Sequence, residues 1–192
     1  IVAYGDPVLK RKAKDIPKDY PKLQQLIDDM FETMYNAQGV GLAAPQIGKS
    51  IRLFIVDASP FAEDENVSEE ERQVLKNTKE VFINPEIISE VGDEWDFNEG
   101  CLSIPEVRED VFRKPDIKIE YYNRDFELQT KSLVGLYARV VQHEFDHIEG
   151  ILFTDKLSGL KKRLIKGKLN SIARGKIKVD YRMRFPKLKK GK

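Results

Sequence analysis

The 192-residue chain contains a single cysteine, Cys101, and only two histidines. One cysteine forms no internal disulfide, so this thiol is a packing group, a reactive group or a metal ligand. No stretch approaches the roughly 18 consecutive apolar residues of a membrane helix, and the first dozen residues lack the basic, apolar and small-residue order of a signal peptide. A cytoplasmic protein without a membrane anchor is therefore the prediction.

The chain also has almost no net charge, at +1, but its basic and acidic residues are unevenly distributed. Residues 158–192 carry 14 basic side chains and one acid, whereas residues 1–157 carry 19 basic and 31 acidic side chains. Hydrophobic residues make up 41% of the chain, enough for one core in a chain of this length. We therefore predict one domain, with residues 1–157 as its main body and residues 158–192 as a basic C-terminal helix and tail of the same unit.

Hydrophobic spacing predicts a mixed set of elements that do not alternate as βαβ units would, which favours the α+β class. Ten residues from Gly39 to Gly48 hold three glycines and a proline, so a loop with special backbone angles is expected there. Six acids between Glu63 and Glu71, within a longer acidic insertion at 62–79, predict an exposed, mobile segment. The predicted helices are 23–34, 133–149 and 160–172, and the predicted strands are 51–56, 81–88, 117–122 and 128–131.

Both histidines belong to one motif, His143-Glu144-Phe145-Asp146-His147. On a helix this spacing puts two imidazoles on one face, where they can share a metal ion, with Glu144 projecting toward a metal-bound water. The alternative is that both histidines are core residues with ordinary hydrogen-bond partners, but this leaves Glu144 between them unexplained. The pattern favours a metal site.

A catalytic metal site of this kind needs a third protein ligand. The protease pattern with a third histidine six residues after the second fails, because position 153 is phenylalanine. The pattern with a downstream glutamate fails as well, because no glutamate follows Glu149. Cys101 remains as the partner that would complete a Cys/His/His set, although an isolated cysteine is more often an inert packing group.

Three separated motifs then make the chain resemble the peptide deformylases, which remove the formyl group from the initiator methionine of new polypeptides. The similarity runs from about Gly5 to about Leu157, and the departures are the acidic insertion and the basic tail. It implies antiparallel sheets packed around a central metal-binding helix, with one N-terminal and one C-terminal helix. The motifs, in family order, are Gly39–Gln46, Glu99–Ser103 and Gln142–His147.

The resemblance implies that Cys101, His143 and His147 bind one divalent ion with water as the fourth ligand. In this interpretation Glu144 takes the proton of that water and delivers it to the departing amine. Thiolate and imidazole suit both Zn(II) and Fe(II). Because deformylases are generally regarded as ferrous enzymes that tolerate zinc, nickel or cobalt, the resemblance favours Fe(II).

Further roles follow from the same resemblance. The side-chain amide of Gln46 and the backbone N–H of Leu102 would stabilise the oxyanion, and Leu136 and Val140 would line the methionine pocket together with Val40. Arg108 and Arg113 correspond to arginines common in the family. Contacts to the extended peptide are implied for Gly39, Val40, Gly41, Glu99 and Gly100.

Two alternative functions and a set of partners are also predicted. Another amidase or peptidase is one alternative, and a non-catalytic, metal-stabilised binder of formylated chains is the other. The second needs a closed four-ligand site, for which the chain has no further cysteine or histidine.

Nascent formyl-methionyl polypeptides are the expected partners. The basic C-terminal segment is either a solvated surface or a ribosome contact, and no DNA-recognition motif is present.

Overall fold

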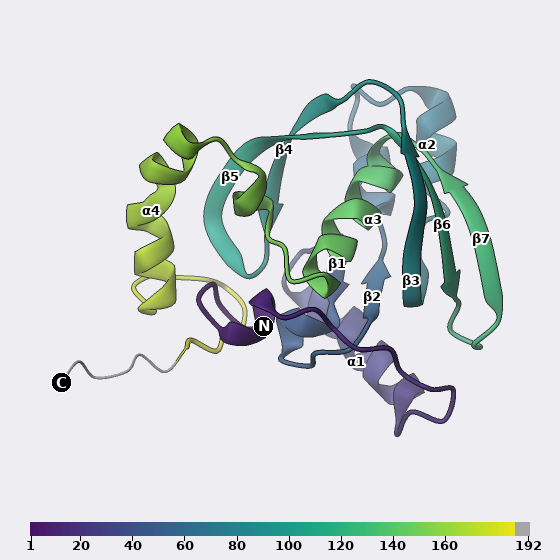
Figure 1. Cartoon of the computed structure of the whole chain (residues 1–192). Coiled ribbons are helices and arrows are strands. Elements are labelled where there is room, and N and C mark those ends of the chain that lie inside the picture. The colour runs from purple at the N-terminus through teal and green to yellow at the C-terminus, as the bar shows by residue number, and fades with distance from the viewer. Residues whose placement is uncertain (187–192) are drawn as a thin grey trace.

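The computed structural model describes residues 1–186, which form an α+β fold with two antiparallel sheets (Figure 1). The larger sheet has the strand order β1-β2-β3-β6-β7, and β4 and β5 form a separate hairpin. The strands are β1 (Gly41–Ala43), β2 (Leu53–Val56), β3 (Glu80–Val91), β4 (Trp95–Cys101), β5 (Ile104–Arg113), β6 (Asp116–Tyr122) and β7 (Leu128–Leu133). This confirms the predicted fold class.

The helix α3 (Gly135–Ile148) lies between the large sheet and the hairpin (Figure 1). Tyr137, Val141 and Ile148 share one face of this helix, and all three are buried. These side chains join a core with Phe54, Phe82 and other sheet residues. Burying each large apolar side chain contributes roughly 1.5–3 kcal/mol, which fixes α3 as a rigid support for its polar residues.

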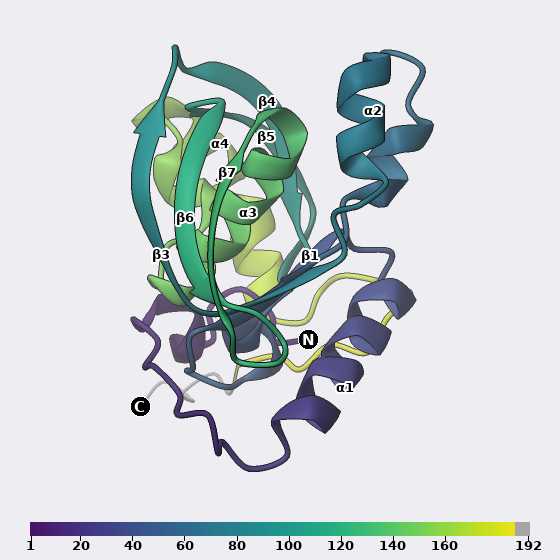
Figure 2. The ribbon, with the colours of Figure 1, turned by 90° about the vertical axis from the view of Figure 1, so that its right-hand side faces the viewer.

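Two further helices close the outer faces. The helix α1 (Leu23–Asn36) buries the predicted apolar stripe against β1 and β2, and the helix α4 (Gly159–Ala173) packs beside β5 (Figures 1 and 2). Ser158 begins α4 by accepting a hydrogen bond from the backbone of Lys161, a typical N-cap. None of the helices within residues 1–186 is long and apolar enough to cross a membrane.

The acidic insertion is mostly exposed, as predicted, and part of it is helical. A short 3-10 helix, η3 (Ser59–Glu63), overlaps its start, and the helix α2 (Glu69–Leu75), which Ser68 caps, lies within it. Three acids in the first turn of α2 favour this helix because they face its positive end. Leu75 is fully buried and attaches the segment to the core, which charge counting alone does not reveal.

The glycine-rich segment also differs from its prediction. Gly41–Ala43 is a strand, β1, and Ala44–Ile47 is a 3-10 helix, η2; only Gly48 among its glycines has a positive φ, of 85°. The other two are required for space: a Cβ on Gly41 would lie 2.5 Å from Glu144 Oε1, and one on Gly39 would lie 2.7 Å from Leu102 Cδ1. Close packing therefore explains Gly39 and Gly41.

The β4–β5 hairpin, which the sequence analysis missed, carries the cysteine. Cys101 pairs with Ile104 across a turn made by Leu102 and Ser103. The first N-terminal residues pass beside this turn, and the segment after α4 returns to the same place, where Val2 pairs in parallel with Arg184. Both ends of the described chain therefore lie next to the cysteine-bearing turn.

Candidate metal centre and active site

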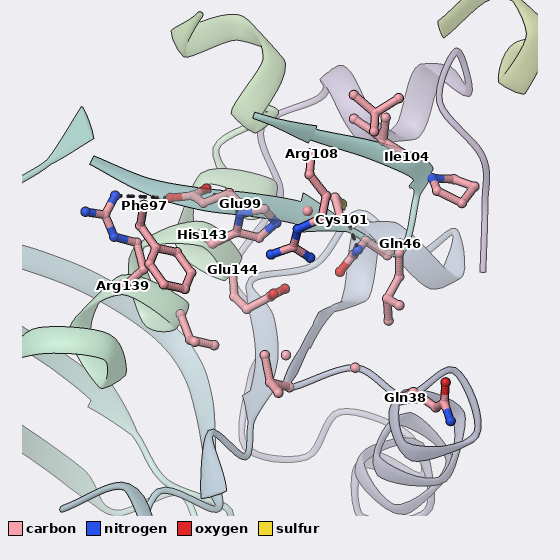
Figure 3. Close-up of a pocket in the computed structure, with 18 of the residues that line it drawn as sticks. Gln38, Gln46, Phe97, Glu99, Cys101, Ile104, Arg108, Arg139, His143 and Glu144 are labelled. Atoms are coloured by element: carbon pink, nitrogen blue, oxygen red, sulfur yellow. Dashed lines mark hydrogen bonds and ion pairs between the residues drawn. The ribbon is translucent and has the colours of Figure 1, made fainter. Parts of the chain in front are cut away.

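Cys101, His143 and His147 come together where the hairpin faces α3, and Figure 3 shows two of them, Cys101 and His143. Cys101 ends β4, and the histidines are one turn apart on α3. One ligand atom from each lies within 4.8 Å of the other two, and Cys101 Sγ is 3.2 Å from His147 Nε2. The sequence motif and the lone cysteine thus converge at one place.

This donor set fits a divalent metal ion. Ligands at roughly 2.0–2.3 Å from one ion lie within a few ångströms of each other, as these three do. His147 is 1% exposed and its Nδ1 has no hydrogen-bond partner within residues 1–186. The chain has no second cysteine or third histidine, so this set supplies three ligands, the number that catalytic metal sites typically use.

Glu99 orients one of the histidines. Its Oε2 lies 2.9 Å from His143 Nδ1, which turns His143 Nε2 toward the other two ligands. A carboxylate in this position fixes the ring and its tautomer and makes the imidazole a better ligand. Glu99, expected to contact the peptide, lines the cavity, and its carboxylate also contacts His143.

Arg113 holds Glu99 in place. Its Nε and Nη2 donate to the two oxygens of Glu99 at 2.7 and 2.9 Å, and its Nη1 donates to Asp146 Oδ2 at 2.6 Å. Arg139 adds a bond of 3.2 Å to the same carboxylate. Burial opposes ionisation of Glu99, but the bonds from Arg113 and His143 outweigh it, so the pKa of Glu99 lies well below its usual range. The carboxylate stays charged.

Glu144 points into the same site from α3 (Figure 3). It is 4% exposed, and its Oε2 has no hydrogen-bond partner within the described chain. Burial raises its pKa to about 7. A carboxyl group with this pKa can accept and return a proton at neutral pH.

Gln46 and Leu102 flank Cys101. The carbonyl oxygen of the Gln46 side chain accepts a bond of 2.7 Å from the Ala43 backbone, which directs its amide nitrogen to within 3.5 Å of Cys101 Sγ. Gln46 is therefore a held donor beside the metal ligands rather than a loop residue facing solvent. Leu102 follows Cys101 directly, with its side chain packed against Gly39.

A cavity of about 410 Å³ opens onto these groups. Gly39, Val40, Gly41, Gly100 and Val140 line it, as the sequence analysis expected. Leu136 does not: it lies outside the cavity lining and packs against the core beneath, where its backbone N–H donates to Glu71 of α2 at 2.8 Å.

Several lining residues were not predicted. Phe61 of η3 and Phe97 of β4 meet edge to face with centroids 6.2 Å apart, and Arg139 lies over Trp95. Alternation of aromatic and polar residues along 95–101 could have indicated the strand, but the pairing that brings Phe61 to it is not local. Tyr181 lines the cavity from the C-terminal segment, and burial raises its pKa to about 12.

The two arginines after the cysteine motif have different environments. Arg113 is buried in the network described above. Arg108 is exposed and lines the cavity, where its Nε donates to Asn98 Oδ1 at 2.9 Å. A Cβ on Gly100 would lie 2.8 Å from Arg108 Nη1, so Gly100 gives this side chain room.

Comparisons with known proteins agree with one another. The family model described as "Polypeptide deformylase" matches residues 1–163. The chain is 66% identical over 192 residues to a peptide deformylase of Christiangramia forsetii, covering all of this chain and 98% of that one, and 57% identical to one of Flavobacterium johnsoniae, with the same coverage. A crystal structure of a peptide deformylase from Legionella pneumophila is 39% identical, with a TM-score of 0.76, and the match covers 92% of this chain and 95% of that one.

Proposed function

The chain belongs to the polypeptide deformylase family and is a metal-dependent hydrolase, and we propose that it acts through the residues gathered around Cys101, His143 and His147. Its reaction is the hydrolysis of the N-formyl group from N-terminal formyl-methionine of newly made polypeptides, with release of formate. The observation that carries the residue assignment is the buried Glu144 carboxylate beside three converging ligand atoms.

The three ligands hold one divalent ion, and Fe(II) is the ion we propose, with Zn, Ni or Co able to substitute. A bound ion of this class polarises the formyl carbonyl and lowers the pKa of a water toward neutrality. Glu99 and Arg113 keep His143 in its ligating orientation, as their bonds of 2.7–2.9 Å support.

Glu144 is the proton carrier. Its unpartnered Oε2 accepts the proton of the attacking water, and the same carboxyl group then donates that proton to the leaving amine of methionine. Burial favours the protonated form of this carboxyl group, so it can take the proton from water and hold it for the amine.

Gln46 and Leu102 stabilise the negative charge that develops on the former formyl oxygen. The side-chain amide of Gln46 is held beside Cys101, and the backbone N–H of Leu102 follows Cys101 directly in the chain. A donor held before reaction needs little rearrangement. The methionine side chain enters the apolar part of the cavity beside Val40 and Val140, and the peptide runs past Gly39, Gly41 and Gly100.

The test is formate release from a formyl-Met-Ala-Ser peptide by protein purified without air in Fe(II) or Ni(II) buffer. The Glu144→Gln variant keeps the size of the side chain and should bind the metal, but its kcat should fall by roughly 10²–10⁴-fold. An exposed variant, Glu94→Gln, serves as the control. Metal bound by every protein with no formate from the parent chain would contradict the proposal.

The basic C-terminal segment is proposed to contact the ribosome, with residues 1–157 as the catalytic part and 158–192 as part of the same domain in the cytoplasm. Lys162, Lys166 and Lys168 of α4 are exposed, as are the apolar side chains Leu160 and Leu164. Residues 187–192, which complete the predicted tail, lie outside the described residues.

Ribosome binding by this segment should weaken as salt rises, because it would depend on phosphate contacts. Reversing the charge at Lys166 and Lys168 should weaken binding further, whereas reversal at the exposed Lys118 of β6 should not. Co-sedimentation with ribosomes measures this. Ribosome binding that depends neither on salt nor on the charges of α4 would contradict the proposed contact.

A further inference from the structure

The C-terminal segment reaches back to the active site. After α4 ends at Ala173, the chain turns and brings Tyr181 to the turn that follows Cys101. The Tyr181 hydroxyl donates a hydrogen bond of 2.6 Å to the carbonyl oxygen of Leu102, and the side chain lines the cavity. A residue 79 positions further along the chain therefore contacts the backbone beside a metal ligand.

This contact lies beyond the part of the chain that the family model covers. That match ends at residue 163, whereas Tyr181 follows 18 positions later. The family model itself therefore does not include Tyr181.

The returning segment is well attached. Arg184 exchanges backbone hydrogen bonds with the N-terminal residues: its N–H donates to Ile1 at 2.8 Å and its carbonyl accepts from Ala3 at 2.9 Å. Apolar side chains of the segment pack against the core that holds Ile104 and Val107, and they are Ile177, Met183 and Phe185. The Tyr181 hydroxyl is thus presented from a supported backbone rather than from a free tail.

Two hydrogen bonds restrain the turn itself. Besides the bond from Tyr181 to Leu102, the backbone N–H of Tyr4 donates to the carbonyl of Ser103 at 2.8 Å. These two carbonyls are consecutive, so the peptide planes on the C-terminal side of Leu102 have fixed directions. Because the N–H and the carbonyl of Leu102 are separated only by its own two backbone dihedrals, holding the carbonyl also limits where its N–H points.

We propose that Tyr181 is a positioning residue for the hydrolytic reaction, whose hydroxyl holds the Leu102 carbonyl and so aims the Leu102 N–H at the formyl oxygen. The role rests on the proposed function, in which that N–H stabilises developing charge. A donor that is displaced from its direction stabilises the transition state less, while leaving binding of the methionine side chain elsewhere in the cavity unchanged.

The Tyr181→Phe variant removes the hydroxyl and keeps the ring, so the cavity wall and the packing of the segment remain. Loss of one neutral hydrogen bond corresponds to about a five- to tenfold fall in kcat, with KM within about twofold of the parent. The matched control is Tyr35→Phe, which removes a hydroxyl that donates to Asp57 at 2.6 Å, outside the cavity lining. Its kcat should equal that of the parent.

A second readout does not depend on catalysis. In the zinc-loaded protein, the amide nitrogen of Ser103 shares a peptide group with the Leu102 carbonyl, so removing the Tyr181 bond should shift its ¹⁵N resonance. Tyr35→Phe should leave that resonance in place. A shift together with a fall in kcat supports the positioning role.

The other outcomes overturn it in distinguishable ways. An unchanged kcat in Tyr181→Phe, or a rise in KM alone, shows that Tyr181 does not act through Leu102. An unmoved Ser103 resonance shows that the hydrogen bond does not restrain the turn. A parent chain that releases no formate overturns the proposed function as a whole, whatever the resonance of Ser103 does.

Discussion

Replacing Glu99 by glutamine should damage both the stability of the fold and its hold on the metal. The change is nearly isosteric, but it removes the charge to which Arg113 and His143 are bonded. The side-chain amide nitrogen of glutamine would also face one of the guanidinium N–H groups of Arg113. Both groups are donors, so they cannot form a hydrogen bond with each other. Because Arg113 and Glu99 have side chains only 3% and 4% exposed, water cannot replace the lost partner.

The size of the effect follows from the contacts that remain. Removing one partner of a buried ion pair typically costs 3–5 kcal/mol, and Arg113 keeps its bond of 2.6 Å to Asp146, so we expect the lower end, about 3 kcal/mol. At roughly 2–4 °C per kcal/mol for a chain of this size, Tm should fall by about 6–12 °C. Loss of the carboxylate behind His143 should weaken metal affinity by roughly 10–100-fold.

The effect should also depend on pH. In the folded chain the pKa of Glu99 lies well below its usual range, because the bonds from Arg113 and His143 outweigh the cost of burial. Its stabilisation is therefore complete above the pKa of an unfolded glutamate, about 4.3, and is lost as pH falls below that value. Glu99→Gln should remove this part of the acid sensitivity.

Urea unfolding of metal-free protein between pH 3.5 and 7, with Glu120→Gln as an exposed control, measures the free energy of unfolding. Titration with zinc then gives the metal affinity of each variant. A Glu99→Gln variant as stable as the control at pH 7, or one that binds zinc as tightly as the parent, would refute the reasoning about this network.

Three other predictions concern neighbouring features. Gly41→Ala should lower kcat by about 10–100-fold with metal content retained, because the new Cβ would displace Glu144 Oε1, 2.5 Å away; normal kcat in steady-state assays would be inconsistent with this. The iron form should lose activity in air as iron or Cys101 oxidises, whereas a nickel-loaded sample should persist; equal decay of formate release in both would count against iron. Despite partial burial, the bonds from Lys12 and Arg52 hold the pKa of Glu149 below its usual value. Its contribution to stability is therefore present above the pKa of an unfolded glutamate and declines as pH falls below it. In thermal unfolding, Glu149→Gln should reduce the loss of Tm at acidic pH, and an unchanged loss would argue against these ion pairs.

The helices and the metal-binding motif could be predicted because their signals are local. A spacing of four residues places His143 and His147 on one face of any helix, whatever surrounds it. The apolar stripe from Leu23 to Met34 similarly specifies a one-sided helix, and the structure has it buried as expected. Cys101 could be assigned to the same site as the two histidines because it is the only cysteine in the chain. A residue type that occurs many times could not be assigned in this way.

The hairpin and the ion network could not be predicted because their partners are set by pairing between distant strands. Arg113 reaches Glu99 across β4 and β5, where Glu99 pairs with Glu109, and reaches Asp146 on α3. The extent of the cavity could not be predicted for a related reason, since a helix period gives the face of a residue but not where a cavity ends. The helix within the acidic insertion could not be predicted either, because a strong charge pattern concealed an N-cap at Ser68 and an anchor at Leu75.

The meeting of both chain ends at the turn after Cys101 has a consequence for synthesis. The metal ligands are all present once residue 147 has left the ribosome, but the backbone bonds of Arg184 and the Tyr181 contact must wait until those residues have emerged as well. A nascent chain that ends between these points therefore has its complete ligand set while the turn after Cys101 still lacks the contacts that hold it.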